Sequence, residues 1–167
     1  MTITPQWEQR SAELWATIGE FEPADFRARI GALADELPSG HPVAYFERAS
    51  AHDSTGQGEE AVPLYRKALE AGLTGERRRR AVIQMASTLR ALGNAETSVE
   101  LLTAERDNGS DNLDDAVTAF LALALIDVGR EREAAALALG ALSRHLPRYN
   151  RSLANYAKIA IGEEPTA

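Results

Sequence analysis

The residues best suited to chemistry in this chain are four consecutive arginines, Arg77–Arg80. Guanidinium groups hold phosphate and carboxylate oxygens through paired hydrogen bonds, so the run could bind a phosphate-rich partner. A helix is expected here, however, and it would spread consecutive side chains around its axis, near the positive end of its dipole. A solvated face paired with acidic neighbours such as Glu70 and Glu76 is therefore the simpler interpretation. Phosphate binding is kept as an alternative.

The other titratable residues form no catalytic or metal-binding pattern. They are the histidines His41, His52 and His145 and the adjacent acidic pairs Glu59-Glu60 and Asp114-Asp115. The histidines lack the spacing of metal ligands, and the acidic pairs fall at expected helix starts, where negative charge suits the dipole. The chain has no cysteine, no phosphate-binding glycine loop and no nucleophile motif. We therefore expect no enzyme activity, no cofactor and no metal.

Composition narrows the class of protein further. The chain has 167 residues, 44% of them hydrophobic, which is enough for a core, and its net charge of −7 disfavours nucleic acid as a partner. The apolar run from Ala116 to Ile126 is too short to span a bilayer, so no membrane partner is expected. The first ten residues do not resemble a secretion signal. These observations predict a cytoplasmic protein.

A triplet of small residues recurs four times along the chain. Its centre is a glycine at spacings of 37, 37 and 36 residues: Gly19, Gly56, Gly93 and Gly129. Seven residues before each glycine stands an alanine: Ala12, Ala49, Ala86 and Ala122. Five residues after each stands another small residue: Ala24, Ala61, Ser98 and Ala134. Such a period indicates stacked copies of one structural element.

Each repeat is predicted to be a pair of antiparallel helices. Apolar residues recur at intervals of three and four, each glycine would cap a first helix in the left-handed conformation, and the small residues would let the paired helices approach closely. The fold class is therefore all-α, a solenoid in a single domain over residues 1–167. Its repeats cover about 5–38, 42–74, 79–110 and 115–147, and a helix over 148–161 is interpreted as a solvating cap, with Tyr149, Leu153, Tyr156 and Ala160 on one face.

These helix pairs resemble the tetratricopeptide repeat (TPR) family. The second repeat matches the family pattern best, through Tyr45, Ala49, Gly56, Ala61 and Tyr65. The repeats are 36–37 residues long against about 34 in the family, and the proline that closes the family's repeat is missing after the second and third. The chain thus looks like a small standalone TPR protein with slightly long repeats.

The resemblance implies a binding site in a concave groove lined by the first helix of each pair. Counting back ten, six and three residues from the glycines gives the expected groove residues Phe46, Ser50, Asp53, Ile83, Ser87, Arg90, Leu123 and Ile126. An apolar stripe with a few charges suits a peptide or helix of a partner. The resemblance therefore implies a non-catalytic scaffold for an unidentified protein or peptide.

Three alternatives stay open. The chain could be a structural module that associates with itself as a homo-oligomer. It could also be an accessory protein that binds phosphate or nucleic acid through Arg77–Arg80. Some family members clamp a terminal carboxylate with asparagine and basic residues, which Asn150, Arg151, Asn155 and Lys158 could imitate on the last helix.

Overall fold

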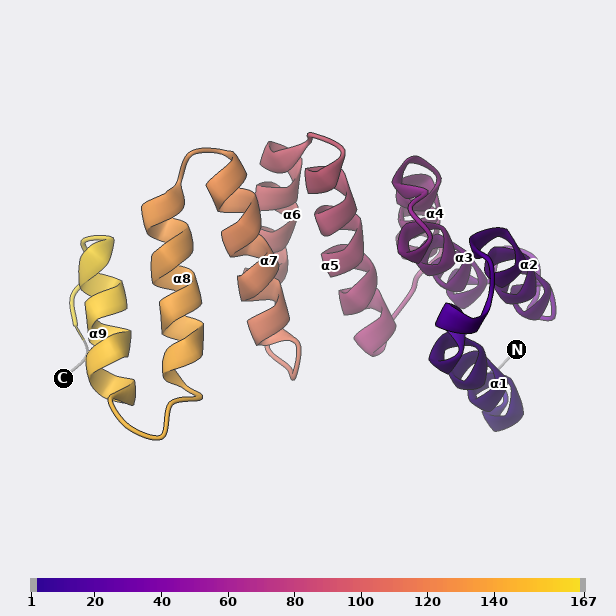
Figure 1. Cartoon of the computed structure of the whole chain (residues 1–167), viewed down its shortest axis with the longest axis horizontal. Coiled ribbons are helices and arrows are strands. Elements are labelled where there is room, and N and C mark those ends of the chain that lie inside the picture. Colours follow the sequence, from indigo (N-terminus) through magenta and orange to yellow (C-terminus); the bar gives the residue numbers. More distant parts are fainter. Residues whose placement is uncertain (1–2, 166–167) are drawn as a thin grey trace. The chain divides into compact units, whose positions relative to one another are not determined.

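The computed structural model describes residues 3–165, which contain nine α-helices, one 3₁₀ turn and no strand (Figure 1). The chain divides into two compact units, an N-terminal unit over Met1–Thr88 and a C-terminal unit over Leu89–Ala167. Helix α5, Gly75–Ala91, belongs mostly to the first and ends in the second. Prediction and structure agree on an all-α fold built from neighbouring helix pairs.

The N-terminal unit holds four complete helices. They are α1 Pro5–Ala16, α2 Pro23–Ala34, α3 Pro42–Ser54 and α4 Gly58–Glu70. The first three begin at a proline, whose fixed φ and missing N–H suit the first helical position. Phe26 and Ile30 of α2 and Ala51 of α3 form a buried cluster, and the Trp15 ring meets Phe26 edge-on at a centroid distance of 5.1 Å.

The C-terminal unit stacks four helices in chain order (Figure 1). They are α6 Ala95–Asp107, α7 Asp114–Asp127, α8 Glu131–Ser143 and α9 Asn150–Ala160. Leu102 of α6, Leu121 and Leu125 of α7 and Ala134 of α8 are buried between them. Each helix except the first and last therefore packs on the one before it and the one after it.

A left-handed glycine ends the first helix in three of the four repeats. At Gly56, the glycine N–H donates to the Asp53 carbonyl at 3.1 Å and the next N–H donates to the His52 carbonyl at 2.8 Å. The same pair of bonds recurs at Gly93 and Gly129, each with a positive φ. These bonds define the Schellman cap, which satisfies the last carbonyls of a helix and reverses the chain.

The first repeat departs from this pattern. Gly19 lies in the 3₁₀ turn Ile18–Glu20 and is not left-handed, and Ala12 and Ala24 are exposed. The expectation of a glycine cap and a close helix crossing is therefore wrong for this repeat. In the other repeats the equivalent small residues are buried: Ala49, Ala61, Ala86, Ser98, Ala122 and Ala134. Large side chains, Trp15 and Phe26, fill the contact between α1 and α2 instead.

The last helix ends in the same cap as the first helices. Gly162 has a φ of +81°, its N–H donates to the Ile159 carbonyl, and the Glu163 N–H donates to the Lys158 carbonyl. The spacing of 33 residues from Gly129 hid this fifth glycine from the sequence pattern. Because it ends in this cap, α9 resembles the first helix of a repeat, which we call a first-type helix. The second helix of a repeat is called a second-type helix.

Exposure along α9 differs from what a solvating cap would show. Tyr149 and Tyr156 are exposed, whereas Ala157 is buried and Leu153 is half-buried. The outward side of this helix therefore presents large apolar side chains.

Two glycines of the C-terminal unit should respond to alanine with opposite signs. Gly129→Ala forces a side chain into φ +75° and should cost about 1 kcal/mol. Gly140→Ala lies inside α8, where an added Cβ meets nothing within 4 Å, and should stabilise by about 0.5–1 kcal/mol. Urea unfolding followed by circular dichroism measures both values. Equal changes in the free energy of unfolding for the two substitutions would contradict the left-handed cap at Gly129.

Candidate functional site

Three of the expected groove residues are core residues in the N-terminal unit. Phe46, Ser50 and Ile83 are only 1%, 2% and 5% exposed. A partner cannot reach side chains this buried without opening the unit. The polar member of the three, Ser50, lies within 3.4 Å of the buried Tyr65 hydroxyl.

Asp53 is half-buried and already occupied by neighbours in the same unit. Its carboxylate accepts hydrogen bonds from the Tyr65 hydroxyl at 3.2 Å and the Thr88 hydroxyl at 2.7 Å. Burial raises the pKa of Tyr65 far above its usual range, so this phenol stays a neutral donor. Asp53 therefore joins α3, α4 and α5 together, and the expected groove residue Ser87 of α5 is half-buried.

The expected groove residues of the C-terminal unit are accessible. Leu123 and Ile126 of α7 are 43% and 48% exposed, and they stand three residues apart on one side of the helix. Arg90, at the end of α5, donates to the Asp127 carboxylate at 2.8 Å. An ion pair thus borders two exposed apolar side chains, and this arrangement can hold an apolar side chain of a partner beside a polar group.

Helix α9 carries a second exposed apolar pair at the same two positions, six and three residues before the capping glycine. We call these two positions the register. Tyr156 and Ile159 stand six and three residues before Gly162, as Leu123 and Ile126 stand before Gly129, and they are 68% and 53% exposed. The sequence prediction missed them because Gly162 breaks the 37-residue period. Among the described residues, every exposed large hydrophobic side chain lies between Leu92 and Ile161, in the C-terminal unit.

The first arginine of the run, Arg77, is a structural residue. Its guanidinium makes two hydrogen bonds to the Glu8 carboxylate, at 2.8 and 2.6 Å, and a third at 3.3 Å to Glu47. The Trp15 indole N–H donates to the other Glu47 oxygen at 2.7 Å. Glu47 is almost fully buried, so these bonds compensate a charge removed from water. The network ties α1, α3 and α5 together.

The other arginines of the run do not form an open phosphate cluster. Arg79 is buried, and the Arg80 guanidinium lies 5.3 Å from the centre of the Phe46 ring in a cation–π contact. Arg77 meets Glu8 and Glu47 rather than the sequence neighbours Glu70 and Glu76. The run is thus spread around α5, as helix geometry requires.

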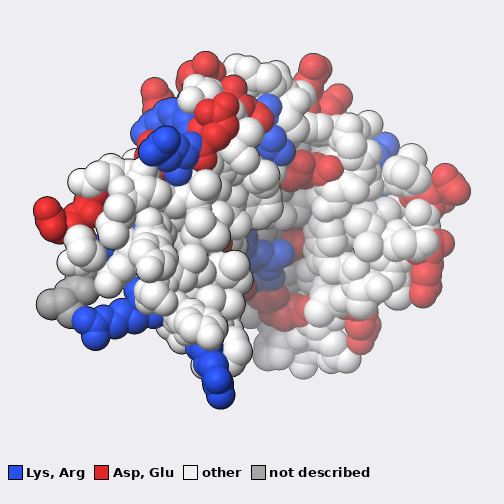
Figure 2. All heavy atoms as spheres, turned by 60° about the vertical axis from the view of Figure 1, so that its left-hand side comes forward, with Lys and Arg blue, Asp and Glu red and all other residues white. Residues whose placement is uncertain are grey.

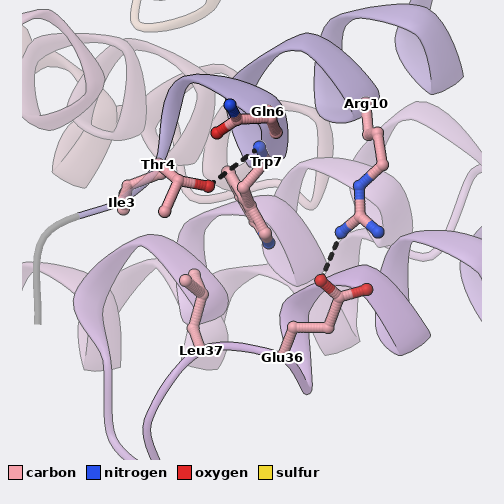
Figure 3. Close-up of a pocket in the computed structure, with 7 residues that line it drawn as sticks. All are labelled: Ile3, Thr4, Gln6, Trp7, Arg10, Glu36 and Leu37. Carbon is pink, nitrogen blue, oxygen red and sulfur yellow. Dashed lines mark hydrogen bonds and ion pairs between the residues drawn. The ribbon is translucent and has the colours of Figure 1, made fainter.

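A pocket of about 370 Å³ lies beside the start of α1 (Figure 3). Arg10 and Glu36 pair across it, and Thr4 accepts the Trp7 backbone N–H at 3.2 Å. The Trp7 indole N–H donates to the Leu33 carbonyl at 2.9 Å. The Arg10, Glu36, Thr4 and Trp7 side chains are thus already paired with one another or with the backbone.

Residues 3–165 contain no group of three or more His, Asp or Glu side chains placed to hold a metal ion. Within the same range, no helix combines the length and the apolar character needed to cross a membrane.

A family model described as Tetratrico peptide repeat matches residues 42–160. The match covers most of the chain, which therefore belongs to the tetratricopeptide repeat family. It begins at the start of α3 and leaves out α1 and α2, the helices whose glycine and small residues depart from the pattern. No significant match is found among curated proteins or among solved structures.

Removing Arg77 should destabilise the N-terminal unit strongly. Arg77→Met leaves Glu47 buried without its cation, and we expect a loss of about 3 kcal/mol in the free energy of unfolding. Arg66→Met, at an exposed position of α4, should change it by less than about 0.5 kcal/mol. Both tryptophans, Trp7 and Trp15, lie in α1, so urea unfolding followed by tryptophan fluorescence reports on this unit. Similar losses in the two variants would contradict the network.

The pH dependence of stability should change with Glu8. Its hydrogen bonds with Arg77 lower the pKa of Glu8, so the folded state binds its proton less readily than the unfolded chain. This contribution is present above the unfolded pKa, near 4.5, and is lost as pH falls through the lower folded value. Glu8→Gln should therefore flatten the acid side of the stability profile, measured by urea unfolding between pH 7 and 3. An unchanged slope below pH 5 would count against this role for Glu8.

Proposed function

We propose that the chain is a non-catalytic protein-interaction module that binds an apolar segment of a partner on its C-terminal unit. Membership of the TPR family supports a protein partner. The observation that carries the proposal is the repeated exposure of apolar side chains at one register. Leu123 and Ile126 on α7 and Tyr156 and Ile159 on α9 are exposed.

The helices that carry these four side chains indicate what kind of ligand would bind them. All four stand on helices that pack against α8, so a rigid framework holds them and little order must be gained on binding. Pairs of apolar residues three apart on a helix suit a partner helix with apolar residues at i, i+3, i+4 and i+7. The Arg90–Asp127 pair adds a polar contact that fixes orientation.

The polar positions of the N-terminal unit suit a different role. Asp53 is held by Tyr65 and Thr88, and Arg77 by Glu8 and Glu47. Freeing any of these groups for a ligand would leave its partner unpaired, which is costly inside a protein. We therefore propose that the N-terminal unit supports the fold and the C-terminal unit contacts the partner.

Charge introduced at the apolar register should abolish binding without unfolding the protein. We expect Leu123→Glu with Ile126→Glu to lose a partner captured from an extract of the source organism, because an apolar contact would have to bury two carboxylates. Leu92→Glu is the matched control, since Leu92 is 41% exposed on the same unit but lies outside the register. Quantitative mass spectrometry compares the captures. Equal capture by all variants, or equal loss in the control, would overturn the proposal.

A further inference from the structure

The end of α8, the turn after it and the start of α9 carry a second group of exposed apolar and basic side chains. We call it the α8–α9 corner: Leu139, Leu142, Arg148, Tyr149 and Arg151. Leu139 and Leu142 are three residues apart and share one side of α8. Leu142 is 49% exposed and Tyr149 is 77% exposed. The corner is distinct from the surface on α7, because none of its residues stands at that register.

Ala135 and Ala138 lie beside the corner on α8, at positions that are buried or half-buried in the earlier second-type helices, whereas the positions of Leu139 and Leu142 are exposed or half-buried in those helices too. Nine residues after the repeat glycine stand Tyr65, Leu102 and Ala138, and the first two are completely buried whereas Ala138 is exposed. Six residues after it, Val62 is buried, Val99 is half-buried and Ala135 is exposed. Helix α8 thus exposes small residues at two positions where α4 and α6 carry larger, buried or half-buried side chains.

The corner is held in a strained and well-braced conformation. Tyr149 has a φ of +68° and is the single described non-glycine residue with a positive φ. An aromatic residue in the left-handed region costs about 1 kcal/mol or more. The Asn150 amide donates to the Ser143 carbonyl at 2.9 Å and to the Leu146 carbonyl, which locks the turn. The fold therefore holds a large aromatic ring in solvent, where it makes no contribution to the core.

The charge around the corner is basic in an acidic protein. Residues 134–162 include Arg144, Arg148, Arg151 and Lys158 and no Asp or Glu, against a net charge of −7 for the whole chain. Arg144 and His145 are engaged with Asp115, but Arg148 and Arg151 have no ion-pair partner among the described residues. In Figure 2 the near side of the C-terminal unit is mostly uncharged, with basic side chains at its lower edge.

We infer that the α8–α9 corner is a docking surface for an acidic amphipathic helix of a partner protein. Its apolar side chains would cover Leu139, Leu142 and Tyr149, and its carboxylates would pair with Arg148 and Arg151 in bidentate fashion. Tyrosine and arginine around a leucine pair are the residue types that dominate binding energy at interfaces. This surface would work alongside the one proposed on α7 and does not depend on it.

Two other occupants fit the charges less well. A second copy docked symmetrically on the same surface would bring Arg148 and Arg151 against their own counterparts, which like charges oppose. An anionic membrane would gain only about 1 kcal/mol from each of two arginines, too little to hold a chain of net charge −7 at the surface. The acidic helix satisfies both the apolar and the basic parts of the corner.

The test uses the whole protein and two designed 18-residue helical peptides. Both have leucines at i, i+3, i+4 and i+7, and one is flanked by glutamates and the other by lysines. Binding is followed by fluorescence anisotropy of labelled peptide and by chemical-shift changes in the labelled protein. We expect the glutamate peptide to bind with shifts at the α8–α9 corner, and the lysine peptide to bind at least about tenfold more weakly.

Variants then distinguish the two surfaces. Leu142→Glu should abolish binding of the glutamate peptide, and Arg148→Glu with Arg151→Glu should weaken it about tenfold or more. Leu92→Glu, at a leucine that is 41% exposed and belongs to neither surface, is the matched control and should leave it unchanged, with circular dichroism verifying the fold of each variant. Equal binding of both peptides, equal loss in Leu92→Glu, or loss only in Leu123→Glu on α7, would overturn the inference. So would self-association, or binding to phosphatidylserine vesicles, that disappears in Leu142→Glu.

Discussion

A backbone constraint underlies the repeated part of this structure. A first-type helix must end and reverse within a few residues, and the left-handed glycine at Gly56, Gly93, Gly129 and Gly162 achieves this with the same two hydrogen bonds each time. A residue with a Cβ pays for that conformation, which is why the position is glycine. The cap then fixes the register of the helix, so that residues three and six positions earlier occupy equivalent places in each copy.

Equivalent places carry different chemistry in the two units. In the N-terminal unit these positions on α3 hold Ser50 and Asp53, which bond to Tyr65 and Thr88 inside the fold. In the C-terminal unit they hold Leu123, Ile126, Tyr156 and Ile159, which are exposed. In the N-terminal unit these positions therefore hold the helices together, and the Glu8–Arg77–Glu47 network adds to this. We propose that the C-terminal unit uses them for recognition.

The fold could be predicted from the sequence because glycine spacing and helical periodicity are local signals. Prediction and structure agree that the chain is all-α and built from neighbouring helix pairs. The first repeat was mispredicted, because Gly19 shares the spacing but not the conformation, and bulky Trp15 and Phe26 replaced the small-residue contact. Spacing alone does not reveal whether a glycine is left-handed.

The candidate site could be predicted only in part. Counting back from the glycines selected Leu123 and Ile126 together with Phe46 and Ile83, although the first two are exposed and the last two buried, because burial depends on what packs opposite. The partners of Arg77 were missed because Glu8 lies 69 residues away, beyond any helical spacing. Tyr149, Tyr156 and Ile159 were predicted as parts of a solvating cap, since an amphipathic helix does not reveal which of its faces is covered.

The central claim is that the expected groove residues Phe46, Ser50 and Ile83 are buried in the N-terminal unit, whereas Leu123 and Ile126 are exposed in the C-terminal unit. Isoleucine methyl NMR with a soluble gadolinium chelate measures this directly, because the chelate broadens only the signals of accessible methyl groups. The account predicts strong broadening at Ile126 and Ile159 and protection at Ile83 and Ile30. Broadening of Ile83 as strong as that of Ile126 would contradict it and return the binding surface to the N-terminal unit.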